Sequence, residues 1–353
     1  MKAAIVVVFA LIFIGCGVKD EIPGDPTAAA ASNAGIAPLP KLNLRHDTFL
    51  ESQIAEIASQ AQGRVGVSAV MLETGDAAEL NAEAQFPMQS VYKLPIAMAV
   101  LYASSQGKLS LNQQINVRPS DFVRLGVRSP IRNQFPQGGV FTIRELLAQA
   151  ISESDGTAND ILLEQAGGPA GVMDYLDKLG IKAMSVMDSE KDIFKDWDTQ
   201  YRNSATPRAT VELLRQLQFG AGIPPEPREE LLYLMKSSGP GYRRLKHLLP
   251  KDIEIAHKTG TGGTKPVGTP TPNTATTASP IPVKAPRSKP TPRPVGSPQI
   301  VSSSTNDVGI IYLPNGKHIL IAVYVADSTA SAFIREGTIA QIAKAVWDRW
   351  STM

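Results

Sequence analysis

A serine and a lysine stand three positions apart at the head of an apolar segment. They are Ser90 and Lys93 in QSVYKLPIAM. If this segment is a helix, both side chains share one face, and the positive end of the helix dipole lies beside the hydroxyl. A serine becomes a nucleophile when a neighbouring base takes its proton, and a lysine with a lowered pKa can be that base. The pair predicts acyl transfer through serine, although Ser-x-x-Lys alone is more often a helix cap beside a solvated lysine.

Two further motifs lie downstream of this pair. Ser154-Asp155-Gly156 occurs in SESDGTAND, and Lys258-Thr259-Gly260 occurs in EIAHKTGTGG. Ser-x-x-Lys, Ser-Asp-Asn and Lys-Thr-Gly together are the signature of class A β-lactamases and penicillin-binding proteins. Two of the three motifs match fully, and the third has Gly156 in place of asparagine.

From about His46 to its C-terminus the chain resembles a class A serine β-lactamase. The stretches that carry the resemblance include FPMQSVYKL, SPIRNQFP, AHKTGTGG and GIIYLPNGKHILIAVYVADS. In such an enzyme Ser90 would attack the lactam carbonyl, and Lys93 would assist its deprotonation. The backbone N–H groups of Ser90 and Thr261 would stabilise the oxyanion. Ser154 would relay a proton to the departing nitrogen.

The resemblance also implies the residues that hold the substrate. Gly156 lacks the side-chain amide that would contact the substrate's acylamino group. Arg128 stands where many relatives have an aromatic residue at the mouth of the site, and Gly260 would keep its strand bare for the substrate. The residues implied to bind the substrate carboxylate are Lys258, Thr259 and Thr261.

Hydrolysis of the acyl-enzyme depends, in this family, on a glutamate that activates water. Counting back from DTQYRN, the best match is Glu190 in MDSEKDIFKD. The family usually has an asparagine four residues later, where this chain has Phe194, and the Arg-x-Glu-Pro frame is absent. Asp188, Asp192 and Asp196 are close enough to be rivals for the role.

Periodic patterns predict the elements that position these residues. Helical spacing follows Thr48 and returns near the C-terminus, and Asn315-Gly316 joins two strand signals as in a hairpin. Pro95 predicts an interruption of the helix that carries Lys93. We expect an α+β fold, in which an antiparallel sheet is flanked by N- and C-terminal helices and interrupted by an inserted all-α domain. The α/β domain would comprise residues 46–105 and 240–353, and the all-α domain residues 106–239.

The segment from Thr264 to Thr305 fits neither domain. It is rich in proline, carries several Lys and Arg and has no acidic residue. Such a composition cannot build a core. We expect an extended, partly polyproline loop, inserted in a strand-strand hairpin beside the active-site entrance.

The N-terminus reads as a targeting segment. Lys2 precedes an apolar run, which is too short for a membrane span but suits a signal peptide over residues 1–15. Phe13-Ile14-Gly15-Cys16 resembles a bacterial lipobox, with Cys16 as the site of lipid attachment; an ordinary secretory signal is the alternative. Residues 16–45 would form a flexible tether. Both alternatives export the protein, and the lipobox predicts a periplasmic enzyme anchored to the outer membrane.

Composition excludes other classes of function. Lys+Arg 35 against Asp+Glu 33 leaves a formal charge of +2, without a basic stripe that nucleic acid would require. Four histidines without ligand spacing and one cysteine argue against a metal site. The resemblance implies a monomer that needs no cofactor and whose partner is a small β-lactam.

We therefore expect a β-lactamase that hydrolyses penicillins or cephalosporins through an acyl-serine and confers β-lactam resistance. A D-alanyl-D-alanine peptidase of the cell wall and a β-lactam sensor that acylates without turnover are the alternatives.

Overall fold

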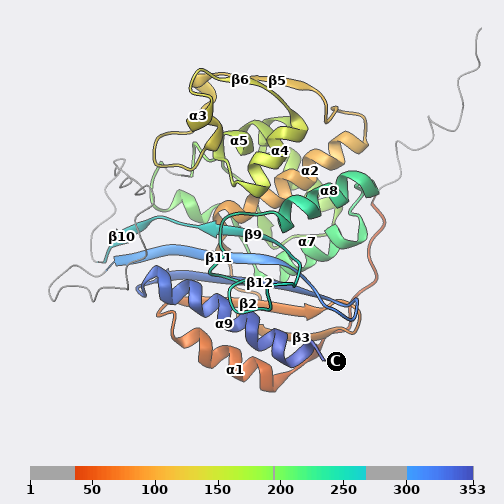
Figure 1. Cartoon of the computed structure of the whole chain (residues 1–353), viewed down its shortest axis with the longest axis vertical. Helices are drawn as coiled ribbons and strands as arrows, with labels where there is room; N and C mark the ends of the chain where they lie inside the picture. Colours follow the sequence, from red (N-terminus) through yellow and green to blue (C-terminus); the bar gives the residue numbers. More distant parts are fainter. Residues whose placement is uncertain (1–35, 194, 268–299, 353) are drawn as a thin grey trace, which may run out of the picture. The chain divides into compact units, whose positions relative to one another are not determined.

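The frame of the protein is an antiparallel sheet (Figure 1). The computed structural model describes residues 36–193, 195–267 and 300–352. The strand order is β1-β3-β2-β12-β11-β10, and β9 also pairs with β11; among these described strands only β1 and β3 pair in parallel. The strands are β1 (Arg45–His46), β2 (Arg64–Met71), β3 (Asp76–Leu80), β9 (Ile255–Thr261), β10 (Thr264–Pro266), β11 (Ile300–Tyr312) and β12 (His318–Ser328).

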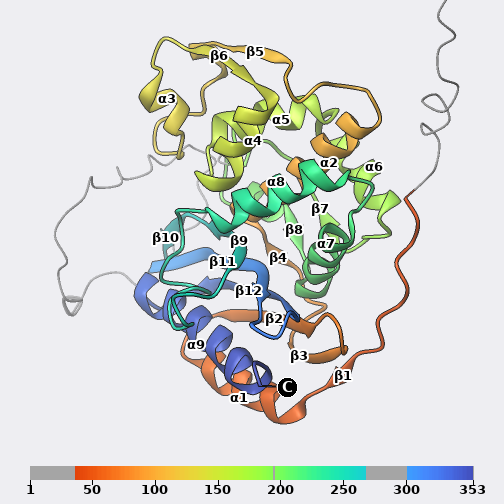
Figure 2. The same cartoon turned by 45° about the vertical axis from the view of Figure 1, so that its right-hand side comes forward.

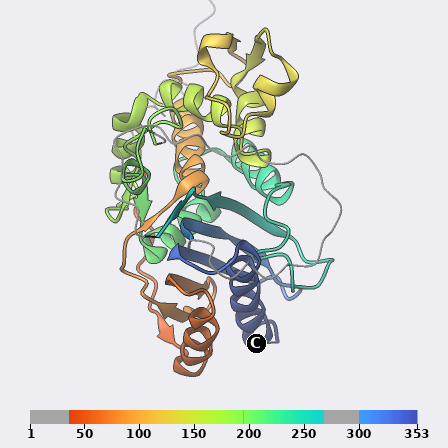
Figure 3. The same cartoon turned by 90° about the vertical axis from the view of Figure 1, so that its left-hand side faces the viewer.

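The central strands of this sheet are buried on both faces. One face packs against the terminal helices α1 (Thr48–Ser59) and α9 (Ala332–Trp350), through residues such as Leu50 and Trp350. The other face packs against the helical layer, chiefly through α7 (Pro207–Phe219) and α8 (Pro225–Lys236) (Figure 3). Because both faces are covered, β2 and β12 are almost continuously apolar. The predicted α+β fold, with its sheet flanked by N- and C-terminal helices, is confirmed.

Helix α2 (Lys93–Ser105) is the centre of the helical layer, and nearly every residue in its first two turns is buried. Pro95 lies in the first turn of α2, where proline is tolerated. The predicted interruption of the helix is therefore wrong. The neighbouring helices are α3 (Pro130–Gln134), α4 (Ile143–Ser152), α5 (Gly156–Gln165), α6 (Gly168–Lys178), α7 (Pro207–Phe219) and α8 (Pro225–Lys236).

The middle of the chain is not purely helical. A two-stranded ribbon joins β5 (Gln114–Val117) to β6 (Gly139–Thr142), and β7 (Met184–Ser185) pairs with β8 (Ser204–Ala205), which pairs in turn with β4 (Phe86–Pro87) (Figure 2). The β-branched residues of QINV and GVFT favour a ribbon. The short strands tie the loop of residues 186–203 to the segment just before Ser90.

The expected loop of residues 264–305 begins and ends in strands. Thr264–Pro266 forms β10, and Ile300 starts β11, whose run of β-branched and small residues pairs with β10 and β12. The loop prediction is therefore wrong at both ends, and residues 268–299 lie outside the described part of the chain. The predicted signal peptide, Cys16 and most of the tether also lie outside it. Where the chain is described, none of its helices has the length and apolarity of a membrane span.

Candidate active site

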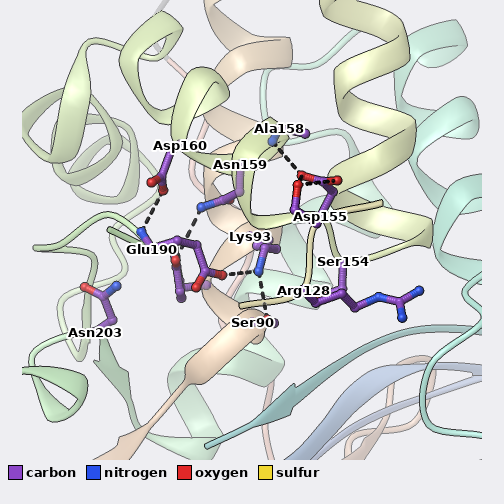
Figure 4. A network of polar contacts seen from close by, with 12 residues as sticks. Ser90, Lys93, Arg128, Ser154, Asp155, Ala158, Asn159, Asp160, Glu190 and Asn203 are labelled. Atoms are coloured by element: carbon purple, nitrogen blue, oxygen red, sulfur yellow. Dashed lines mark hydrogen bonds and ion pairs between the residues drawn. The ribbon is translucent and has the colours of Figure 1, made fainter. Parts of the chain in front are cut away.

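Ser90 lies just before α2, in the 3-10 turn η1 (Gln89–Tyr92). Its side chain is half-buried, whereas Lys93 is only 1% exposed. Lys93 Nζ lies 2.8 Å from Ser90 Oγ and also donates a hydrogen bond to Glu190 Oε1 (Figure 4). The hydroxyl, the amine and the carboxylate thus form one continuous series of polar contacts. All three side chains were predicted as catalytic residues, and they come from two segments far apart in the sequence.

The turn that carries Ser90 is held from two sides. Gln89 has a φ of 49°, a left-handed conformation that few non-glycine residues adopt, and its buried amide donates to Gln200 Oε1 at 3.1 Å. On the other side Asn306 Nδ2 donates to the carbonyl of Met88 at 3.0 Å. A Cβ on Gly260 would lie 2.3 Å from the same carbonyl. Gly260 therefore makes room for the backbone of the nucleophile's turn, a different reason for glycine from the predicted access of substrate to the strand.

Hydrogen bonds from the backbone of the loop to Asp160 hold Glu190 in position. Its N–H donates to Asp160 Oδ1 at 2.6 Å, and the N–H of Lys191 donates to Asp160 Oδ2 at 3.1 Å. Asp160 lies on α5, so this carboxylate ties the loop to the helical layer. Burial and the nearby charge of Glu190 raise the pKa of Asp160 to about 7. Sequence reasoning missed Asp160, because nothing in TANDILL indicates which residue would face the loop.

The three rival carboxylates have other partners. Asp188 pairs with Arg202, Asp192 with Lys195, and Asp196 accepts from Thr199. Glu190 is the one carboxylate of the four that contacts Lys93. Phe194 lies outside the described residues.

Ser154 approaches the nucleophile's neighbourhood from the turn between α4 and α5. It has a φ of 58°, and its Oγ accepts a hydrogen bond from Lys258 Nζ at 2.9 Å. Asp155 stabilises this turn. Its Oδ1 accepts a hydrogen bond from the N–H of Ala158 at 2.9 Å and so caps α5, and Ser129 Oγ donates to both carboxylate oxygens. Lys258 is fully buried, and burial, followed by the positive charge of Lys93, lowers its pKa well below the usual lysine value.

An arginine that the sequence did not single out completes the end of β9. Arg244 is buried, and its Nη2 donates to Thr261 Oγ1 at 2.7 Å. Its Nη1 donates to the carbonyls of Gly260 at 3.0 Å and Asn306 at 2.8 Å. Thr259 is buried beside it, whereas Thr261 is exposed. Arg244 stands in GYRRL without any motif, so only the fold reveals that a third cation joins Lys93 and Lys258 here.

Arg128 and Gly156 lie together on the opposite rim. The N–H of Gly156 donates to the carbonyl of Arg128 at 2.9 Å, and the Arg128 guanidinium pairs with Glu153 at 2.8 Å. A Cβ at Gly156 would lie 3.3 Å from Glu190 Cγ and 3.2 Å from Val127 Cγ1. A side chain at position 156 would therefore point toward the Glu190 loop, so the glycine relieves crowding there.

These contacts define the class of site. A half-buried serine, a buried lysine-carboxylate pair and a second serine-lysine pair are the parts of a serine acyl-transfer site with lysine in place of histidine. Among the described residues no group of three or more His, Cys, Asp or Glu side chains could hold a metal ion.

Comparison with known proteins assigns the family. The model described as "Beta-lactamase enzyme family" matches residues 49–350. The VEB-1 β-lactamase of Pseudomonas aeruginosa is 34% identical, over 85% of this chain and 89% of its own. The PER-1 extended-spectrum β-lactamase of the same organism is 33% identical, over 85% and 86%.

Solved structures agree with this assignment. A β-lactamase from Chitinophaga pinensis is 36% identical with a TM-score of 0.74, over 85% of this chain and 99% of its own. A class A β-lactamase from Bacteroides cellulosilyticus is 28% identical with a TM-score of 0.73, over 87% and 98%. The chain belongs to the β-lactamase enzyme family, and it is a class A serine β-lactamase, as its motifs predicted.

Proposed function

We propose that this β-lactamase opens the lactam amide through an acyl-Ser90 intermediate. Water then hydrolyses this intermediate, with Glu190 as the base that activates the water. The observation that carries the proposal is the series of contacts from Ser90 through Lys93 to Glu190. A hydrolase needs both a nucleophile and a base for water, and here one lysine touches both groups.

In acylation, Ser90 Oγ attacks the lactam carbonyl while its proton passes to the Lys93 and Glu190 pair. The backbone N–H groups of Ser90 and Thr261 face the developing oxyanion. The C–N bond then breaks, and the nitrogen takes a proton from Ser154, whose hydroxyl is bonded to Lys258 at 2.9 Å. The proton that the Lys93 and Glu190 pair took from Ser90 then returns to Ser154, so Glu190 is again free to act as a base. The products of this step are the acyl-serine ester and the amine of the opened ring.

Two cations favour binding of the substrate carboxylate at one end of the site. Lys258 contributes its buried ammonium, and Arg244 orients the Thr261 hydroxyl at 2.7 Å. Thr259 is a further expected ligand, from the same strand. A carboxylate held by several donors in a site with little water is bound strongly and in one orientation.

In deacylation, Glu190 takes a proton from water as the water attacks the ester, and Ser90 recovers its proton when the ester bond breaks. Glu190→Gln keeps the shape of the side chain and removes the base. The expected result with a chromogenic cephalosporin is one stoichiometric burst, with the acyl adduct persisting in the intact mass and turnover reduced at least a hundredfold.

Ser90→Ala is the control, because it should give neither burst nor adduct. Wild-type enzyme that stalls after one turnover would instead support the sensor alternative. An unchanged rate in Glu190→Gln would exclude Glu190 as the base and leave the peptidase alternative open.

We also propose export to the periplasm with a lipid anchor, on the basis of the lipobox-like Phe13-Ile14-Gly15-Cys16. The resemblance to class A β-lactamases favours a monomer. Cys16→Ser should move the enzyme from the membrane fraction to the soluble periplasmic fraction while total activity is retained. Equal soluble fractions for the two proteins would favour the ordinary secretory signal.

A further inference from the structure

The strand that carries Lys258 has a buried polar surface on its other face. Side chains alternate along a strand, so His257 and Thr259 lie on the face that packs toward α1 and α9. The loop between α8 and β9 lies on this face (Figure 1). A Cβ on Gly241 would lie 2.3 Å from Thr259 Cγ2 and 3.6 Å from His257 Cε1, so this glycine lets the loop approach the strand closely. The same loop carries Arg244.

Asp307 joins this loop to the strand. It lies on β11, next to β9, and both its carboxylate and the His257 ring are fully buried. The two carboxylate oxygens lie 2.9 Å and 3.0 Å from His257 Nδ1. Asp307 Oδ2 also accepts a hydrogen bond from the backbone N–H of Leu245 at 3.2 Å. One carboxylate therefore contacts the residue before Lys258 and the residue after Arg244.

A glycine makes room for the histidine of this pair. Gly309 is the partner of His257 across the two strands, and a Cβ there would lie 2.9 Å from His257 Cβ. Within the described residues, Nε2 of His257 has no hydrogen-bond partner. Burying such a polar pair costs free energy that an apolar pair of similar size would not. The catalytic steps proposed above use neither His257 nor Asp307, so neither packing nor those steps account for the pair.

The position of Arg244 depends on this attachment. Its guanidinium donates to two carbonyls of β9 and β11 and to Thr261 Oγ1, and Glu336 Oε1 accepts from its Nε at 3.3 Å. These contacts hold the tip of a long side chain, whereas its backbone lies in a loop of short-range turns. The hydrogen bond from the Leu245 N–H to Asp307 ties that backbone to the sheet.

We propose that Asp307, with His257 as its fixed partner, is a positioning residue for Arg244 in the subsite of the substrate carboxylate. This inference rests on the proposed function, in which Arg244 favours binding of that carboxylate. Asp307 sets the distance of the Arg244 backbone from β9, and the guanidinium then meets the Thr261 hydroxyl in the orientation that suits a bound carboxylate. Asp307 acts through Arg244 and takes no part in bond making or breaking.

The test compares benzylpenicillin with its methyl ester, which lacks the carboxylate charge. His257→Leu combined with Asp307→Leu removes the hydrogen bond to Leu245 and leaves an apolar pair, a replacement that buried ion pairs often tolerate. The expected result is a rise in KM for benzylpenicillin of about tenfold with kcat within about threefold, and a change of less than about twofold in kcat/KM for the ester. Asp307→Ala removes the same hydrogen bond and should give the same shift. Asp307→Asn keeps an oxygen that can accept the Leu245 N–H, so it should stay within about twofold of wild type.

Arg244→Met tests whether the effect passes through the guanidinium. It should raise the KM for benzylpenicillin at least as much as the apolar pair does. Adding the apolar pair to Arg244→Met should raise KM by no more than about a further twofold, whereas a purely structural role would multiply the two effects. Asp252→Asn, an exposed change just before β9, is the control for net charge and should leave both substrates unchanged.

The outcomes separate this inference from the proposed function. An unchanged KM in the apolar pair and in Asp307→Ala, or multiplied effects in the combined variant, would overturn the inference while a raised KM in Arg244→Met still supports the carboxylate subsite. An unchanged preference for benzylpenicillin over its ester in Arg244→Met would overturn the subsite together with the inference. Turnover of benzylpenicillin by the wild type tests the proposed hydrolysis separately, and urea unfolding of each variant checks that the measured enzyme is folded.

Discussion

At the residue scale, the site concentrates charge in places that water hardly reaches. Lys93, Lys258 and Glu190 are each at most 3% exposed. A buried charge without a partner is costly, whereas a hydrogen-bonded pair offsets much of that cost. Glu190 is therefore both a candidate base and the counter-charge that lets Lys93 stay buried beside Ser90.

This dual role predicts a coupling between the two residues. Glu190→Gln should lower the free energy of unfolding by about 3 kcal/mol, because it leaves the Lys93 ammonium buried without an anion. Adding Lys93→Met should recover part of that loss. Urea unfolding of the two single variants and the double variant measures the coupling, and strictly additive changes would contradict it.

The lowered pKa of Lys258 predicts an alkaline limb in activity. Because burial and Lys93 disfavour the charged form, Lys258 loses its proton at a lower pH than an ordinary lysine, and attraction for the substrate carboxylate weakens as pH rises. As pH rises, kcat/KM should start to decrease at a pH below 10.5, the ordinary pKa of lysine, and the decrease should come mainly from a rise in KM. In Lys258→Arg, whose guanidinium keeps its charge, the fall should shift upward; an unmoved limb would assign the titration to another group.

At the scale of elements, the site depends on how the loop of residues 186–203 is attached. Asp160 on α5 accepts two backbone N–H groups of this loop, and Gln200 binds Gln89 at 3.1 Å. Asn203 joins the two ends of the loop, because its Oδ1 accepts the N–H groups of Met187 at 2.7 Å and Asp188 at 2.9 Å. Hydrogen bonds to the helical layer and to η1 thus hold the base in reach of the nucleophile.

Asp160 predicts a pH dependence of stability. Its pKa in the folded protein is about 7, against 3.8 as the ordinary value, so the native state retains a proton that the unfolded chain loses. This contribution to the free energy of unfolding is therefore present at low pH and is lost as pH rises from about 4 to about 7. The difference in stability between wild type and Asp160→Asn should shrink over that window.

Urea unfolding of both proteins at pH 5, 6, 7 and 8 measures the difference. The amide of the Asp160→Asn variant can accept one of the two loop N–H groups but not both, so the variant should also deacylate more slowly. Glu164→Gln, an exposed change on the same helix, is the control. A difference in stability that stays constant with pH would contradict the assignment to Asp160.

At the scale of the whole molecule, the sheet and its terminal helices form the base on which the site is assembled. The strands β9 and β11 bring Lys258 and Asn306 to the turn of Ser90, while α4 and α5 bring Ser154. The proline-rich segment leaves this assembly at β10 and rejoins it at β11, next to the contact between Lys265 and Trp197.

Deleting residues 268–299 and closing the gap with Asn-Gly should leave the fold intact. The deleted residues are poor in large apolar side chains, and a shorter loop costs less closure entropy, so the free energy of unfolding should stay level or rise by up to about 2 kcal/mol. Thermal unfolding and the kinetics of small and bulky β-lactams measure the result. Lower stability would show that the segment contributes to the core, and unchanged kinetics would remove its predicted influence on the entrance.

The sequence by itself determined the class of the protein. Its three motifs, the periodicity of its helices and strands and the hairpin at Asn315-Gly316 are local patterns, and each reflects short-range chemistry: helix faces, strand alternation and turn geometry. The nucleophile, its lysine and the second serine-lysine pair could all be named from these patterns, as could the antiparallel sheet and its terminal helices.

Only the tertiary structure decided which distant residues meet. Arg244 and Asp160 lie in stretches without a motif, and their roles come from hydrogen bonds to segments far away in sequence. The contact with Lys93 that separates Glu190 from its three rivals, the packing role of Gly260 and the contact between Trp197 and Lys265 likewise depend on long-range approach. Such contacts follow from how sheets, helices and loops pack together, and local sequence does not encode that geometry.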